Sequence, residues 1–313
     1  MTTLLLTHPA SLGHDMGPGH PERPDRIRAI ESSLAAETFR KLVREQAPAG
    51  PREAIVRVHA EDYVDAIFAA APSKGLAQLD SDTAMGPGTL AASLHAVGAA
   101  CRAVDAVMSG AAGNCFAAMR PPGHHAERAR AMGFCFFDNA AIAARHAQVA
   151  HSAERVAIVD FDVHHGNGTQ DIFWSDPSVL YCSTHQMPLY PGTGSVNETG
   201  EHGTIVNAPL APGDGSEAFR AALRERILPR IDAFAPDLVV VSAGFDAHRR
   251  DPLANLQLVE EDFGWVTMKL LDLAEKHARG RLVSILEGGY DLDALARSTA
   301  AHVAALMGSA QSD

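Results

Sequence analysis

The chain contains few cysteines, few aromatic residues and too little positive charge to balance its acidic residues. Its four cysteines are spread over 313 residues with no Cys-x-x-Cys pair. This pattern excludes a short disulfide-stapled scaffold and favours a reducing compartment. Lys and Arg total 26 against 38 Asp and Glu, a formal net charge of -12. Such a field repels polyphosphates, which disfavours direct nucleic-acid binding, and attracts cationic substrates or basic protein tails.

Targeting and membrane signals are also missing from the sequence. The first residues, MTTLLLTHPA, have no basic leader, and their apolar run is too brief for a signal peptide. We expect no apolar stretch of the sequence to be long enough to cross a bilayer. We therefore expect a cytoplasmic protein that does not bind membranes; an oligomer is compatible with the sequence.

Short runs of apolar and β-branched residues alternate with amphipathic helical patterns from one end of the chain to the other. The predicted buried strands are Thr3 to Thr7, Asn114 to Ala118, Arg155 to Asp160, Leu238 to Ser242 and Arg281 to Leu286. The predicted helices are Pro21 to Ala35, Leu90 to Ser109, Asn139 to Val149, Glu217 to Phe234, Glu260 to His277 and Leu292 to Met307. This alternation predicts one α/β domain over residues 1–313, with a mostly parallel sheet and helices on both faces.

One long segment, Ser183 to Gly203, fits neither pattern and contains Pro-Leu-Tyr-Pro-Gly-Thr-Gly. We expect it to be irregular. It is too long for a simple connection, and loops of this length usually carry function.

Four of the predicted strands end in polar clusters. In open α/β sheets, ligands bind beyond the carboxyl ends of the strands, so these clusters are the first candidates for a functional site. In strand order, the candidate residues are His124 and His125; Asp160, Asp162, His164 and Asn167; Asp246; and Tyr290.

The second cluster has the spacing of metal ligands. Alternate residues of an extended chain point the same way, so Asp160, Asp162 and His164 share one side. Asp162 and His164, with Asp246 from another strand end, form a plausible set of two carboxylates and one imidazole with open positions for water. Zinc is the first choice for this set, and Fe²⁺ also accepts these ligands.

Each cluster also has a structural interpretation when it stands alone. An Asp-x-Asp-x-His strand end is often a hydrogen-bonded turn, and a lone aspartate such as Asp246 is more often a helix cap. Tandem histidines are usually satisfied polar structure, and Gly-Gly-Tyr is usually a turn followed by a packing aromatic. The occurrence of all four at strand ends favours chemistry.

These residues lie in motifs that resemble the histone deacetylase superfamily, and within it the class II type common in bacteria. The similarity spans nearly the whole chain, in the family's order. The stretches that carry it are HDMGPGHPERPDRI at His14 to Ile27, RPPGHHA at Arg120 to Ala126, GFCFFDNAAIAA at Gly133 to Ala144, VDFDVHHGNGTQDIF at Val159 to Phe173, YPGTG at Tyr190 to Gly194, SAGFDAHRRDPL at Ser242 to Leu253, and LEGGYD at Leu286 to Asp291.

The resemblance implies the single-domain arginase/deacetylase fold, with about eight mostly parallel strands, and a deacetylase activity. It implies that Asp162, His164 and Asp246 bind zinc, that His124 and His125 flank the attacking water, and that Tyr290 faces the substrate carbonyl. It further implies a substrate tunnel and a structural potassium ion. The tunnel positions are Gly133, Phe134, Tyr190 and Leu253, and the potassium positions are Asp160, Asp162, His164, Ser183 and Thr184.

Within this family scheme we expect His125 to be the general base and Tyr290 to donate to the developing oxyanion. Asp160 is expected to accept a hydrogen bond from His124 and favour its charged form. Asn167 departs from the class I pattern, which has a carboxylate at this position, so His125 should be less basic than in class I relatives.

The expected substrate is an acetylated amine. Family members act on acetyl-lysine in proteins, acetylated polyamines or other small acetylated amines, and the catalytic set does not separate these. The polyamine branch carries a glutamate near the position of Leu253, so this leucine favours acetyl-lysine. An arginase-like ureohydrolase would need two manganese ions and more carboxylates, and a non-catalytic acyl-lysine binding module would not need Tyr290, so both are weaker alternatives.

Overall fold

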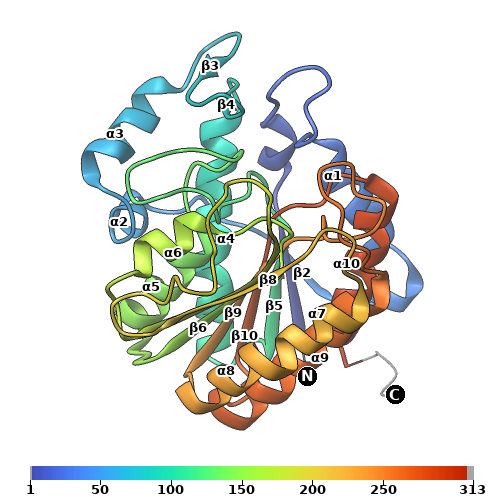
Figure 1. Cartoon of the computed structure of the whole chain (residues 1–313). Helices are drawn as coiled ribbons and strands as arrows, with labels where there is room; N and C mark the ends of the chain where they lie inside the picture. The colour runs from blue at the N-terminus through green and yellow to red at the C-terminus, as the bar shows by residue number, and fades with distance from the viewer. Residues whose placement is uncertain (1, 309–313) are drawn as a thin grey trace.

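A central sheet dominates the computed structural model, which describes residues 2–308 (Figure 1). The sheet has eight strands in the order β2-β1-β5-β10-β9-β6-β7-β8. Every pair of neighbours is parallel, which places all the carboxyl ends at one edge. The strands are β1 (Thr3–Thr7), β2 (Val43–Gln46), β5 (Asn114–Ala117), β6 (Val156–Asp160), β7 (Val179–Gln186), β8 (Ile205–Leu210), β9 (Leu238–Ala243) and β10 (Leu282–Leu286); β3 (Ala77–Gln78) and β4 (Ala84–Met85) form a separate antiparallel pair.

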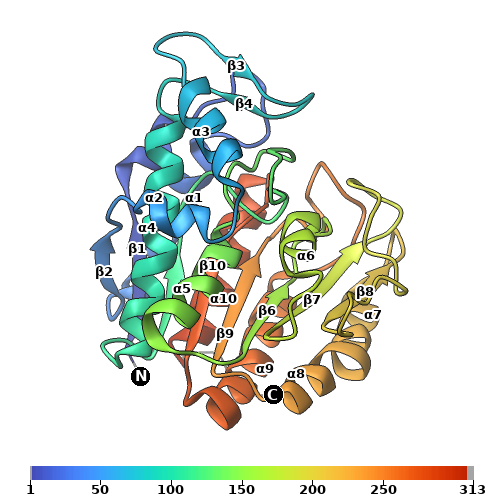
Figure 2. The ribbon, with the colours of Figure 1, turned by 90° about the vertical axis from the view of Figure 1, so that its left-hand side faces the viewer.

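Helices cover both faces of the sheet, as the two views in Figures 1 and 2 show. One apolar core lies under α2 (Arg52–Val56), α3 (Glu61–Ala70), α4 (Thr89–Met108), α5 (Asn139–His151) and α6 (Asn167–Phe173). The other lies under α1 (Asp25–Leu34), α7 (Ser216–Ala222), α8 (Leu228–Phe234), α9 (Glu260–Ala278) and α10 (Leu292–Leu306). Short 3₁₀ helices η1 (Pro9–Gly13) and η2 (Glu37–Phe39) and the π-helical turn η3 (Leu223–Ile227) complete the elements.

The strands supply both cores because successive side chains point to opposite faces. On β6, Val156 and Ile158 lie in the first core, whereas Ala157 and Val159 lie in the second. This two-sided burial explains why the strands appear in the sequence as continuous apolar runs. The prediction of a mostly parallel α/β sheet with helices on both faces is confirmed.

Helix α5 begins close to the carboxyl edge of the sheet and is fixed there by its cap. The Asp138 carboxylate accepts a hydrogen bond from the Ala141 amide at 2.8 Å, as an N-cap does. Its other oxygen accepts a bond from the Thr169 hydroxyl of α6 at 2.7 Å. One side chain therefore starts α5 and ties it to α6.

Most predicted elements match observed ones within two residues at each end, with two corrections in the helices. Pro21 to Ala35 is helical only from Asp25, because the residue before a proline is disfavoured in the α region and Pro24 occupies the N-cap. Glu217 to Phe234 is interrupted by η3, whose wider turn precedes Pro229 at the start of α8. Proline has no amide hydrogen to donate, so the regular helical bonding cannot continue through it.

The expectation that Ser183 to Gly203 is irregular is wrong for its first four residues. They belong to β7, and β8 follows at Ile205. Both strands escaped prediction because β7 ends in a polar run and β8 contains Pro209. The polar run is nonetheless buried, since the strand is covered on both faces.

The expectation that no segment has the length to cross a bilayer is also wrong in its literal form. Helix α4 is long and apolar enough by length and composition, but 67% of its most apolar window is buried inside the structure. The apolar residues of α4 pack on the sheet, as those of a core helix do.

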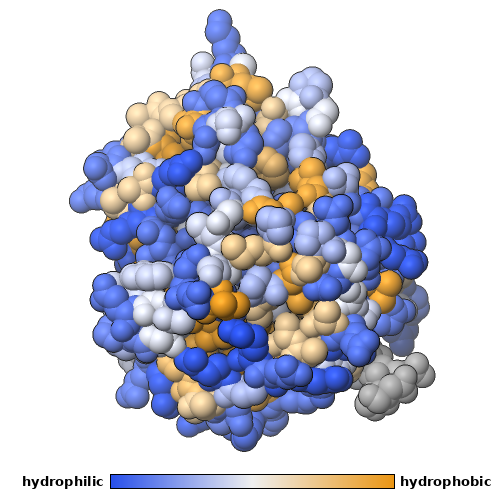
Figure 3. Space-filling model, in the orientation of Figure 1, coloured by the Kyte–Doolittle hydropathy of each residue, from blue (hydrophilic) through white to orange (hydrophobic). Residues whose placement is uncertain are grey.

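The surface of the molecule is mixed in character. On the face drawn in Figure 3, apolar residues are scattered among hydrophilic ones.

The two cores predict a sharp contrast between buried and exposed truncations. Ile158→Ala should destabilise the protein by about 2–5 kcal/mol, because the side chain is fully buried in a central strand. Val149→Ala, at a position 61% exposed on α5, should change stability by about 0.5 kcal/mol or less. Urea unfolding followed by circular dichroism measures both. Equal losses in the two variants would contradict this assignment of the core.

Candidate active site

Four neighbouring strands bring the predicted clusters together. Strands β5, β10, β9 and β6 are adjacent in the sheet, so the residues that follow them meet at the carboxyl edge. The potential ligand atoms of Asp162, His164 and Asp246 all lie within 4.8 Å of one another, and the three residues are buried. His164 Nδ1 lies 3.1 Å from Asp162 Oδ1 and 3.2 Å from Asp246 Oδ2.

The carboxylates of Asp162 and Asp246 pack so closely against Gly244 and Gly288 that no side chain fits at these two glycine positions. A Cβ atom at Gly244 would lie 2.0 Å from Asp162 Oδ2, and one at Gly288 would lie 2.0 Å from Asp246 Oδ2. The Gly288 amide donates to Asp162 Oδ2 at 2.8 Å, and the Val163 amide donates to Asp246 Oδ1 at 2.9 Å. One imidazole and two fixed carboxylates suit a divalent ion of the zinc or ferrous type.

The local potential at this group is strongly negative. Burial works against a charged His164, yet its hydrogen bonds to Asp162 and Asp246 raise its pKa to about 10. Burial and the charge of Asp162 together raise the pKa of Asp246 to about 6. Two buried carboxylates that share one histidine thus favour a cation in their midst.

His124 has the partner that the sequence predicted. Its Nδ1 lies 3.0 Å from Asp160 Oδ2, which also accepts a hydrogen bond from the Tyr181 hydroxyl at 3.0 Å. Burial opposes the charged form of the ring, but the charges of Asp160 and Asp162 raise the pKa of His124 well above its usual value. The contact with a buried carboxylate thus favours the charged form of His124.

His125 has the opposite character. Its Nδ1 lies 2.8 Å from Asn167 Oδ1, while the Asn167 amide nitrogen donates to Glu127 Oε1 at 2.8 Å. Because that amide nitrogen faces a carboxylate, its oxygen faces the ring, and the ring must carry its proton on Nδ1. Burial and the neighbouring charges of His124 and His164 lower the pKa of His125 well below its usual value. His125 is thus neutral, with Nε2 free to accept a proton.

Two acidic residues near the histidine pair were not selected as candidates in the sequence. Glu127 lies behind Asn167 and accepts a hydrogen bond from its amide nitrogen at 2.8 Å. Glu287 is fully buried and accepts bonds from the Gly123 and His124 amides at 2.7 Å and 3.2 Å. Burial raises the pKa of Glu287 to about 8. In the sequence, only the place of Glu287 inside the Leu-Glu-Gly-Gly-Tyr motif could have marked it as a site residue.

A pocket of about 250 Å³ opens above the ligand group. His125, His164 and Tyr290 contribute to its lining, together with all of the predicted tunnel positions. Two lining residues were not expected from the sequence, the apolar Leu189 and the acidic Asp82. The lining is, in full, Asp82, His125, Gly133, Phe134, His164, Leu189, Tyr190, Leu253 and Tyr290.

Tyr290 is held from both its backbone and its ring. Its amide donates to Asp251 Oδ2 at 2.8 Å, and the other oxygen of Asp251 accepts from the Leu253 amide at 3.0 Å. The Arg26 guanidinium lies 5.0 Å from the centre of the Tyr290 ring. Burial raises the pKa of Tyr290 well above its usual value, so its hydroxyl remains a proton donor. Asp251 thereby fixes Leu253 and Tyr290 on the same side of the pocket.

The positions predicted to bind potassium lie on neighbouring strands. Asp160 on β6 is paired in register with Ser183 on β7, and Thr184 follows Ser183. Asp160 Oδ1 also accepts a bond from the Asp162 amide at 3.1 Å. The potassium assignment itself stays a prediction.

Comparison with known proteins places this arrangement in a family. The model of the histone deacetylase domain matches residues 20–306. A histone deacetylase-like amidohydrolase of Pseudomonas aeruginosa is 42% identical, over 87% of this chain and 73% of the relative. A probable deacetylase of Archaeoglobus fulgidus is 39% identical, over 98% of this chain and 87% of the relative.

A solved structure agrees with these sequence matches. The crystal structure of the HDA15 HD domain superposes with a TM-score of 0.93 at 38% identity, covering 98% of this chain and 89% of that one. The chain belongs to the histone deacetylase family. It is a deacetylase, a hydrolase with a candidate metal site at Asp162, His164 and Asp246.

The pocket geometry predicts that Gly133 is essential. It has a φ of +56°, and a Cβ atom there would lie 2.4 Å from Cδ2 of His125. Gly133→Ala should displace His125 and lower kcat/KM by about 100-fold. Gly192→Ala is the matched control, because Gly192 also has a positive φ, of +89°, but a Cβ atom there would meet no other atom within 4 Å. Similar kcat/KM values for the two variants would show that the contact with His125 has no role.

Proposed function

We propose that the protein is a zinc-dependent deacetylase that hydrolyses acetyl-lysine in proteins or peptides. The observation that carries this proposal is the difference between the partners of two adjacent histidines. His124 Nδ1 faces the Asp160 carboxylate at 3.0 Å, which favours a charged ring, while His125 Nδ1 faces the neutral Asn167 amide oxygen at 2.8 Å, which leaves Nε2 to act as a base. Their ring centroids lie 4.0 Å apart, and His125 lines the pocket together with the candidate ligand His164. Hydrolysis of an amide needs both a base and a stabilising positive charge.

Zinc held by Asp162, His164 and Asp246 would polarise the acetamide oxygen and increase the acidity of the attacking water. His125 would accept the water proton at Nε2 and later deliver it to the departing amine. Asn167 supports this role because it fixes the Nδ1–H tautomer of His125. The proton thus passes from water to the amine through a single ring.

His124 and Tyr290 would stabilise the negative charge that develops on the substrate. The charged His124 ring lies next to His125, and Asp160 fixes its orientation. Tyr290 reaches the pocket from the end of the neighbouring strand β10, with a hydroxyl that stays protonated. Donors that are already in place for an oxyanion need no reorganisation during the reaction.

The pocket walls support a substrate with an extended alkyl chain. Phe134, Leu189, Tyr190 and Leu253 present apolar or aromatic surface, which suits the methylene groups of lysine. The apolar Leu253 favours acetyl-lysine over a polyamine. Asp82 supports the second candidate, an acetylated polyamine, because its carboxylate lines the same pocket and can attract a distal ammonium group.

Several further assignments belong to the same proposal. Zinc is preferred over Fe²⁺ for the ligand set, and a potassium ion is assigned to Asp160, Asp162, His164, Ser183 and Thr184 by family resemblance. Residues 1–313 are proposed to form one deacetylase domain, supported by a sheet that takes strands from both ends of the chain. A cytoplasmic location is supported by four free, buried cysteines.

A substrate screen tests the proposed function. Zinc-loaded protein is assayed against acetyl-lysine peptides, acetylated polyamines and longer acyl-lysines. Acetyl-lysine peptides should give the highest kcat/KM. In Asp82→Asn, the kcat/KM for polyamines should fall more than that for neutral-ended peptides. If the protein hydrolyses none of these substrates, the proposal is contradicted.

Tyr290→Phe tests the oxyanion donor. Loss of one such hydrogen bond should lower kcat by about 100- to 1,000-fold, or roughly 3 kcal/mol of barrier. Tyr190→Phe is the matched control, since it removes a hydroxyl from the partly exposed rim of the same pocket. It should leave kcat nearly unchanged. Full activity in Tyr290→Phe would exclude this role.

The pH dependence of the rate tests the assignment of the base. Neutral His125 is required, so activity should fall at low pH as His125 becomes protonated. Asn167→Asp places a negative charge beside the ring and raises its pKa, which should move the acidic limb of the kcat/KM profile to higher pH. Asn197→Asp makes the same charge change at an exposed position outside the pocket lining and should leave the limb in place. Coincident profiles for the parent and Asn167→Asp would contradict the assignment.

A further inference from the structure

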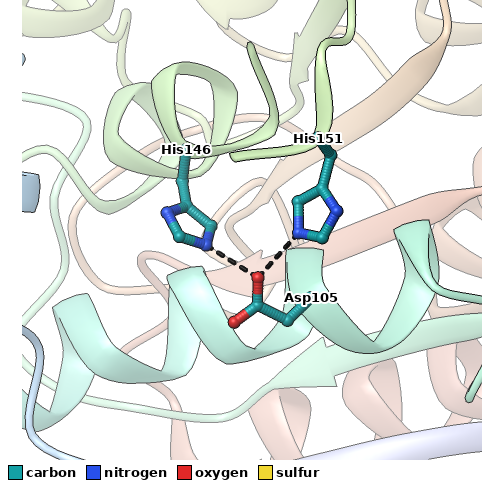
Figure 4. Close-up of side chains that lie close together, drawn as sticks. All are labelled: Asp105, His146 and His151. Atoms are coloured by element: carbon teal, nitrogen blue, oxygen red, sulfur yellow. Dashed lines mark hydrogen bonds and ion pairs between the residues drawn. The ribbon is translucent and has the colours of Figure 1, made fainter. Parts of the chain in front are cut away.

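A second cluster of side chains of the types that ligate metals lies between helices α4 and α5 (Figure 4). Asp105 belongs to the last turn of α4, and His146 and His151 belong to α5. Both histidines direct Nε2 at the same oxygen, Asp105 Oδ1, at 2.8 Å for His146 and 2.7 Å for His151. The three ligand atoms lie within 4.8 Å of one another.

This cluster is separate from the candidate active site. Helix α4 leads into β5 and helix α5 leads into β6, so both helices end near the amino ends of the strands. Asp162, His164 and Asp246 lie at the opposite, carboxyl edge. The two clusters share no residue and no element, and the proposed function does not use Asp105, His146 or His151.

The chemistry of the cluster suits a borderline divalent cation. Two neutral imidazole nitrogens and one carboxylate oxygen form a common zinc-type ligand set, with water completing the coordination. A cation at this position would take the place of the two Nε2 hydrogens that point at one oxygen, and each neutral ring would carry its proton on Nδ1 instead. The side chains of His146, His151 and Asp105 are 16%, 24% and 47% exposed, so an ion and its waters can reach them.

The surrounding charges leave the carboxylate available to a cation. Arg102 is engaged by Glu45 through two bonds of 2.8 Å, and Arg57 makes only a 3.5 Å contact with His146 Nδ1. Within residues 2–308, no lysine or arginine forms an ion pair with Asp105. Burial works against the charged form, but hydrogen bonds from His151 and His146 lower the pKa of Asp105, so it is anionic at neutral pH.

A similar surface cluster around Asp232 serves as a comparison, because its composition does not suit a metal ion. Asp232 Oδ1 also accepts two donors, from Lys276 Nζ and His277 Nε2, each at 2.6 Å. There the second donor is an ammonium group, which repels a metal ion. At Asp105 both partners are imidazoles, and a neutral imidazole can bind a metal ion through the ring nitrogen that carries no proton.

We propose that Asp105, His146 and His151 form a second metal site that binds a zinc-type divalent ion and links α4 to α5. The ion would be held by the two Nε2 atoms and by the carboxylate. It would join the end of one helix to the end of the next, on the face of the sheet where these helices pack together.

Metal stoichiometry tests this site. Chelator-treated full-length protein is dialysed against zinc, and the bound metal is measured by mass spectrometry. The double variant His146→Gln/His151→Gln should bind one zinc fewer per chain than the parent and retain the parent's deacetylase activity per catalytic ion. His277→Gln is the control and should bind as much zinc as the parent. An equal zinc content in the parent and the double variant would overturn the proposal.

A spectroscopic readout identifies the ligands independently of the active site. In an Asp162→Asn/Asp246→Asn background, which disables the other group, added Cu²⁺ should give an electron paramagnetic resonance spectrum with coupling to two imidazole nitrogens. Adding Asp105→Asn should weaken this binding by at least about 100-fold, since loss of a supporting residue alone costs 10- to 100-fold. Zinc should also raise the melting temperature in this background, because it binds only the folded form. A spectrum unaltered by His146→Gln/His151→Gln would exclude the site.

Discussion

The burial of several carboxylates at one edge of the sheet is the constraint on which this site depends. Asp160, Asp162 and Asp246 are at most 1% exposed. Removing ionised groups from water costs several kcal/mol each unless they are compensated. The structure compensates with backbone amides from Val163 and Gly288, with histidines, and with glycines that leave space beside the oxygens. The excess negative charge that remains is what a divalent cation would satisfy.

The different behaviour of His124 and His125 follows from the same distribution of charge. A carboxylate in direct contact raises the pKa of His124, whereas burial and the neighbouring His124 lower the pKa of His125. Asn167 holds the second ring without adding a charge, and Glu127 fixes the orientation of the amide. Two adjacent residues of the same type thus acquire opposite properties from their partners. This is the usual way in which a fold separates acid and base roles.

Helix α5 connects the two edges of the molecule. Its N-cap, Asp138, bonds to α6 near the histidine pair, and its last residue, His151, belongs to the cluster at the amino edge. The helix packs along α4 between these points. A metal ion at the far end would therefore fix the helix whose start supports the active-site loops. The two ends use different chemistry, a hydrogen-bonded cap at one and an imidazole pair at the other.

The sequence by itself determined the alternation of strands and helices, the strand ends that carry polar residues, and the family to which the chain belongs. Periodicity and continuous motifs are local, so they can be recognised without coordinates. Strands β7 and β8 were missed because their polar residues and Pro209 hide a burial that only neighbouring layers create. Only the tertiary structure brought Glu127 to Asn167, Asp82 to the pocket, and Asp105 to His146 and His151. These contacts join residues far apart in the chain, and their distances are set by how helices and strands pack.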